Sequence, residues 1–76
     1  MYFKVSTENR IEIFKNLSTV YGFLVGIFPN YRKYHPNERL FKGWYRVKRK
    51  LKGDKIESQS KDHPFCLEIS SRHFTS

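Results

Sequence analysis

The stretch IFKNLSTVYGFLVGIF, residues 13–28, decides how this chain folds, because it contains the most apolar run of the sequence, residues 20–28. When its residues are placed at 100° steps, the large apolar side chains fall within an arc of about 140°, and small or polar side chains lie opposite. This period predicts an amphipathic helix over residues 8–27, ended by Pro29. A strand over residues 20–28 is the alternative, which the β-branched and aromatic side chains favour.

Alternating apolar and polar side chains predict strands on both sides of this helix. The predicted strands are residues 1–6, 40–51, 55–60 and 65–69, with a hairpin turn at Gly53 and Asp54 and a second turn at residues 62–64. Residues 29–38 contain two prolines and two asparagines and predict an ordered loop with two exposed tyrosines. The order β-α-β-β-β predicts an α+β fold, in which one amphipathic helix packs on one face of a small antiparallel sheet.

The length of 76 residues allows one small domain, which we place at residues 1–70 with a loose tail at residues 71–76. Hydrophobic residues make up 38% and aromatic residues 17%, so we expect one core and neither a two-domain enzyme nor a disordered chain. We expect no signal peptide, and the most apolar run is far shorter than the roughly 20 residues of a membrane span. The single cysteine, Cys66, excludes a disulfide framework and predicts a reducing compartment such as the cytoplasm.

Positive charge is concentrated in one third of the chain. The sequence holds 15 Lys and Arg residues against seven Asp and Glu residues, and ten of those 15 lie within residues 31–55 beside only two acidic residues. The rest of the chain is balanced. An ordinary solvated surface spreads its charges, so this concentration predicts a polyanionic partner.

The predicted strand over residues 40–51 carries the sharpest functional signal. A period of two places five basic or aromatic side chains on one sheet face, about 6–7 Å apart, which is close to the phosphate spacing of a nucleic-acid strand. The other face holds Phe41, Tyr45, Val47 and Leu51. We expect Trp44 to stack on a base while its basic neighbours contact phosphates. With the preceding loop included, the predicted nucleic-acid-binding residues are Tyr31, Arg32, Lys33, Tyr34, Lys42, Trp44, Arg46, Lys48, Arg49, Lys50 and Lys52.

This face predicts a protein that binds nucleic acid with little sequence preference, and it favours RNA over DNA as the partner. Two other interpretations stay open. A solvated face whose lysines block edge pairing would explain two or three of the basic residues. An acidic protein surface would also match the charge, so the alternative function is a small protein-interaction module, either an inhibitor or an accessory subunit of a larger assembly.

A second surface lies on the predicted helix opposite its apolar arc, where Ser18, Gly22 and Gly26 recur every four residues. A glycine within a helix costs about 1 kcal/mol relative to alanine, so two of them on an exposed face need a reason. Small side chains at this spacing allow another backbone to approach, which predicts docking of a partner helix or a homodimer. A helix that curves or frays, or a strand near Gly22, is the alternative.

The sequence contains no recognisable catalytic or metal-binding constellation, and we expect neither an enzyme nor a cofactor. The three histidines, His35, His63 and His73, are separated in the chain. Together with Cys66 they match no metal-site spacing. His35 near Glu38 would suit acid–base cleavage of a phosphodiester, but a loop histidine is more often simply exposed. Lys, Asn, Ile, Phe and Tyr make up 30 of the 76 residues, a bias typical of AT-rich coding in a phage, an organelle or a low-GC bacterium.

Overall fold

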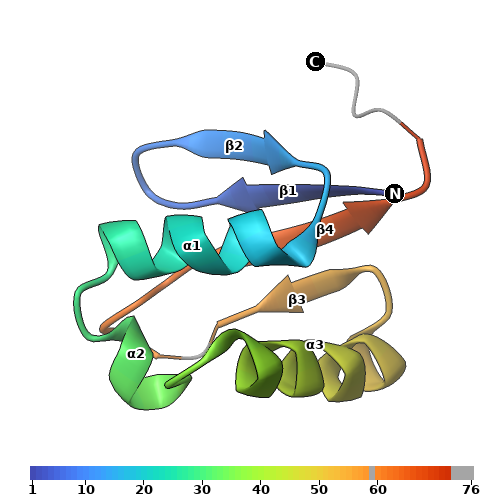
Figure 1. The fold of residues 1–76 in the computed structure, drawn as a ribbon. Helices are drawn as coiled ribbons and strands as arrows, with labels where there is room; N and C mark the ends of the chain where they lie inside the picture. The colour runs from blue at the N-terminus through green and yellow to red at the C-terminus, as the bar shows by residue number, and fades with distance from the viewer. Residues whose placement is uncertain (59, 73–76) are drawn as a thin grey trace.

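The computed structural model describes residues 1–58 and 60–72. Its elements follow the chain in the order β1 (Tyr2–Ser6), β2 (Ile11–Phe14), α1 (Leu17–Ile27), α2 (Tyr31–Tyr34), α3 (Glu38–Lys52), β3 (Lys55–Glu57) and β4 (Cys66–Ser70). The strands form one antiparallel sheet in the order β2-β1-β4-β3, and the two longer helices lie side by side on one face of it (Figure 1). The predicted α+β class and antiparallel sheet are confirmed.

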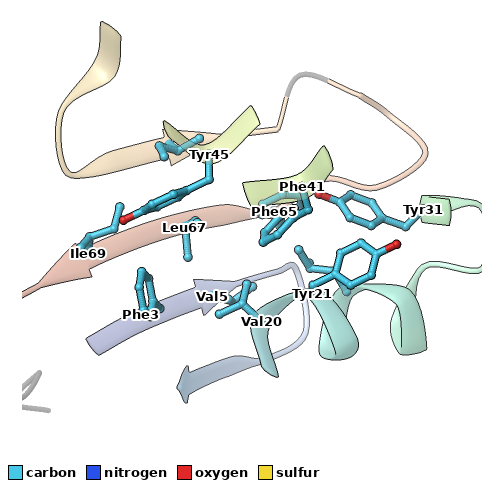
Figure 2. Close-up of a cluster of buried hydrophobic side chains, with 12 residues drawn as sticks. Phe3, Val5, Val20, Tyr21, Tyr31, Phe41, Tyr45, Phe65, Leu67 and Ile69 are labelled. Carbon is cyan, nitrogen blue, oxygen red and sulfur yellow. The ribbon is translucent and has the colours of Figure 1, made fainter. Parts of the chain in front are cut away.

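The core lies between the sheet and the helices (Figure 2). The central strands β1 and β4 pair in the register Phe3↔Ile69 and Val5↔Leu67. These four side chains are buried beneath the helices, because α1 covers β1 and β2 while α3 covers β3. The other buried hydrophobic residues are Val20, Tyr21, Leu24, Tyr31, Phe41, Tyr45, Ile56 and Phe65. One continuous cluster therefore holds both helices against the sheet.

The first helix is shorter than the sequence predicts. It begins at Leu17 instead of residue 8, and the residues before it form β2. Asn16 caps the helix, because its side-chain oxygen accepts a hydrogen bond from the backbone N–H of Thr19 at 2.9 Å. The two β-branched isoleucines of β2 suit an extended strand that pairs with β1. The N-terminal half of the predicted helix is therefore wrong, and its C-terminal half is confirmed.

The residues predicted as a second strand, 40–51, form a helix, α3. Asn37 caps this helix, since its side chain accepts a hydrogen bond from the backbone N–H of Leu40 at 3.0 Å. Glu38 in the first turn and basic side chains in the last turn interact favourably with the helix dipole. Gly53 ends the helix with φ of 79°, which glycine adopts without a Cβ clash. The predicted strand is wrong, and the turn predicted at Gly53 connects α3 to β3.

The element order also differs from the prediction. The expected order β-α-β-β-β is replaced by β-β-α-α-α-β-β, and the predicted loop over residues 29–38 contains the short helix α2. From position 73 onward, the tail predicted at residues 71–76 lies outside the described residues. Within the part of the chain that the structure describes, no helix combines the length and the apolar content that crossing a membrane requires.

Candidate nucleic-acid interface

The outer side of α3 presents three basic side chains in a row. The helix buries Phe41 and Tyr45 against the core. At 100° per residue, Arg39, Arg46 and Lys50 lie on the opposite side, and all three are exposed. A rise of 1.5 Å per residue spreads them over about 16 Å. We call these three residues the basic face of α3.

Carboxylates neutralise few of the basic side chains around this face. Lys42 pairs with Glu38 at 3.3 Å, and Arg49 pairs with Asp54 at 3.5 Å. Both pairs are partly exposed to solvent and therefore weak. Among the described residues, eight of the ten basic side chains in positions 31–55 form no ion pair: Arg32, Lys33, Arg39, Arg46, Lys48, Lys50, Lys52 and Lys55. Within the described residues, none of the three side chains of the basic face of α3 forms an ion pair.

The side chains predicted to share one strand face do not all do so. Helical geometry keeps Arg46 and Lys50 together but turns Trp44 and Lys48 toward the core, where both are half-buried. The Trp44 ring stacks on Phe41 at a centroid distance of 5.7 Å, and its indole nitrogen is buried with no hydrogen-bond partner among the described residues. The prediction that Trp44 offers a free surface for base stacking is therefore wrong.

The C-terminal half of α3 carries a second group of basic residues. Lys48, Lys52 and Lys55 line an open pocket of about 550 Å³ between α3 and β3. Arg49 lies partly inside the fold, where its Nη1 donates a hydrogen bond to the hydroxyl of Tyr45 at 3.1 Å. The predicted binding residues of this helix are thus divided between two surfaces, of which only the basic face points directly away from the core.

The two tyrosines of α2 differ in exposure. Tyr31 is fully buried, so the prediction that it is exposed is wrong. Burial raises the pKa of its hydroxyl far above the usual range, and nearby Tyr34 and Tyr21 raise it further. Tyr34 is 50% exposed, as predicted, and the adjacent Arg32 and Lys33 are exposed as well. The surface of α2 therefore supplies two basic side chains and one accessible aromatic ring.

Two histidines packed against Tyr34 were not predicted to be buried. His35 is 7% exposed and His63 is 4% exposed, and the ring of Tyr34 lies 4.3 Å from the first and 4.7 Å from the second, between centroids. Nδ1 of His63 is 3.0 Å from Oγ of Ser58. Burial lowers the pKa of His35, and the charge of His63 lowers it further. The spacing of four between Tyr31 and His35 is a local signal of this cluster, because it places both rings on one side of a helical turn.

The small-residue stripe of α1 lies where the sequence predicts it. Ser18, Gly22 and Gly26 are exposed, and a Cβ added to either glycine would meet no atom within 4 Å. Docking of a partner helix on this stripe stays a prediction. On α3, by contrast, Val47 and Leu51 do not share the buried side of the helix that a strand would have given them, because both are exposed.

Cys66 in β4 is the one thiol of the chain, and it is half-buried and unpaired. Burial raises the pKa of this thiol, which keeps it protonated and poorly reactive at neutral pH. Among the residues that the structure describes, no three His, Cys, Asp or Glu side chains are grouped to hold a metal ion. Comparison of the chain with models of known protein families, with curated proteins and with solved structures gives no match.

Proposed function

We propose that this protein binds nucleic acid, as RNA or single-stranded DNA, through the basic face of α3. The observation that carries the proposal is the row formed by Arg39, Arg46 and Lys50, which are exposed and lack ion pairs within the described residues. A row of cations about 16 Å long matches several successive phosphates of one strand. A protein that acts through such contacts is a binding protein and needs no catalytic group.

Phosphate contacts explain the charge pattern better than a purely structural role does. Like charges one or two turns apart on a helix destabilise it, so an uncompensated basic row has a cost that binding of a polyanion removes. Contacts to phosphates carry affinity without base identity, so little sequence preference is expected from this face alone. The proposal also places the protein in a reducing intracellular compartment such as the cytoplasm, where the free thiol of Cys66 remains reduced.

The salt dependence of binding tests this proposal. The basic face and Lys33 of α2 together would contact about four phosphates. For a single strand, each phosphate contact adds about −0.7 to the slope of the logarithm of the binding constant against the logarithm of the salt concentration. We therefore expect the affinity for a labelled nine-nucleotide oligouridine to fall about 50-fold between 50 and 200 mM salt, as measured by fluorescence anisotropy. The double variant Arg46→Gln, Lys50→Gln should lower the fall to about sevenfold.

A matched control removes two charges elsewhere. Lys15 and Arg72 are exposed and lie outside α3, so the double variant Lys15→Gln, Arg72→Gln has the same net charge as the α3 variant. We expect this control to keep the steep salt dependence. If both double variants lose affinity equally, net charge and not the basic face attracts the nucleic acid. Absence of binding to both the oligouridine and its DNA counterpart at 50 mM salt would refute the proposed function.

A protein-interaction module remains the second candidate, because one observation favours it. Leu40, Val47 and Leu51 are 51%, 57% and 71% exposed, and their spacing aligns them on one side of α3 next to the basic face. An apolar row flanked by cations suits an amphipathic helix with acidic flanks. The change Leu51→Gln tests this candidate, because it removes apolar surface without changing the charge and should weaken capture of such a partner while leaving the affinity for the oligouridine intact.

A further inference from the structure

A pocket beside Tyr34 lies between α2 and residues 60–63. It is open to solvent and has a volume of about 390 Å³. Its lining residues are Asn30, Lys33, Tyr34, Ser60, Asp62 and His63. This volume lies in the range of small-molecule sites, roughly 300–1,000 Å³, and is therefore large enough for one nucleobase.

The wall of this pocket is a preorganised aromatic surface. Tyr34 is half-exposed, but His35 and His63 contact its ring, at centroid distances of 4.3 Å and 4.7 Å. Both histidines are buried, so their contacts limit the motion of the Tyr34 ring. A ring fixed in this way stacks on a base with little loss of side-chain entropy. The stacking role that the sequence assigns to Trp44 thus falls to Tyr34.

The rim of the pocket offers polar groups suited to the edge of a base. The Asn30 side chain makes no capping hydrogen bond to α2, so its amide can donate and accept. Asp62 brings a carboxylate, which accepts hydrogen bonds at two oxygens and repels a phosphate. Lys33 at the same rim supplies a cation for the phosphate that follows the base. This combination favours a base in the pocket and the sugar–phosphate backbone outside it.

We propose that the pocket beside Tyr34 holds one unpaired guanine of a bound single strand, stacked on the Tyr34 ring with its Watson–Crick edge on Asp62. Guanine fits this site because N1–H and the N2 amino group are adjacent donors, which match the two carboxylate oxygens. Uracil and adenine lack such a pair of donors, and in a duplex the same edge is paired. This inference rests on the proposed function and adds a base preference to it.

The test compares two labelled nonamers, nine uridines and the same strand with guanosine at its centre. We expect the folded protein at 100 mM salt to bind the guanosine strand about tenfold more tightly, because a good bidentate base contact discriminates by about that factor. Asp62→Asn should lower this ratio to near one. Asp54→Asn is the matched control, since Asp54 is an exposed carboxylate outside the pocket, and it should keep the ratio.

Two substitutions of Tyr34 separate stacking from other effects. Tyr34→Phe retains the ring and should keep the preference, whereas Tyr34→Leu should remove it while circular dichroism reports an unchanged fold. Equal affinity of the wild-type protein for the two nonamers, with the salt dependence intact, would overturn the pocket and leave the role of α3 standing. A tenfold preference that survives in Asp62→Asn would also overturn the pocket. If neither nonamer nor its DNA counterpart binds at 50 mM salt, the proposed function and the pocket both fail.

Discussion

Two buried tyrosines provide matched substitutions of opposite effect. Tyr21 and Tyr31 pack against each other with ring centroids 6.2 Å apart (Figure 2). The Tyr21 hydroxyl donates a hydrogen bond to the backbone carbonyl of His35 at 2.6 Å. The Tyr31 hydroxyl is buried and has no hydrogen-bond partner within the described part of the chain. Replacing each tyrosine by phenylalanine removes one oxygen from the same core but leaves different groups behind.

The expected free energies follow from these partners. Tyr21→Phe leaves the His35 carbonyl without its donor in a buried position, which should cost about 1–2 kcal/mol of unfolding free energy. Tyr31→Phe removes a hydroxyl that lost its water on folding and gained nothing in return, so it should stabilise the protein by about 1 kcal/mol. For a chain of this length, about 1 kcal/mol corresponds to a shift of about 4–8 °C in Tm.

Urea unfolding followed by the fluorescence of Trp44 measures both variants at one pH. We expect the urea midpoint of the wild-type protein to lie between those of the two variants, with Tyr31→Phe unfolding at a higher and Tyr21→Phe at a lower urea concentration. An unchanged dependence on urea is required in both cases, since it shows that the unfolded state is the same. Equal destabilisation by the two substitutions would refute the reasoning, because the Tyr31 hydroxyl would then have a partner in solution.

Three further predictions concern pH, the glycine that ends α3 and a glycine within α3. Burial holds the pKa of His35 below its ordinary value of 6.5. The unfolded chain therefore binds a proton at this histidine more readily than the folded chain does. The free energy of unfolding should decline as pH falls below 6.5, with a slope of at most about 1.4 kcal/mol per pH unit. Urea titrations between pH 8 and 5 should show this decline, and His35→Leu should flatten it. Gly53→Ala should cost about 1–3 kcal/mol because φ of 79° and ψ of −139° strain a Cβ. Gly43→Ala, within α3 and in open space, should instead gain about 1 kcal/mol, and a destabilised Gly43→Ala would argue against the exposed position of that residue.

The sequence predicted the fold class but assigned the wrong element to residues 40–51, for a reason that lies in the spacing. Phe41 and Tyr45 are four residues apart, as are Val47 and Leu51. A separation of four residues places both side chains on one side of the chain in either structure, because it equals two side-chain periods of a strand and about one turn of a helix. Other residues of this stretch distinguish a helix from a strand. Asn37 is a good N-cap, and the lysines and arginines between residues 38 and 52 are good helix formers.

The candidate site was predictable in composition but not in direction. The cluster of basic residues is visible in the sequence, and the ones that point outward follow once the helical period is known. The burial of Tyr31 and His35 is different in kind, because it depends on contacts between α2 and residues about 30 positions later, such as His63 and Phe65. No local pattern encodes such contacts, so a tyrosine in a polar segment gives the same sequence signal whether it is buried or exposed.

The pairing of β1 with β4 has a consequence for how the chain folds. It joins Phe3 to Ile69, which closes a loop of more than 60 residues, and forming that loop costs on the order of 4 kcal/mol in chain entropy. Hairpins and helix ends form between residues close in sequence and cost little chain entropy. Their apolar side chains form one core only when β1 and β4 pair. Folding should therefore be slow for so short a chain. It should also be all-or-none, because a fragment that ends before β4 lacks the apolar side chains of β4 on which the rest of the core packs.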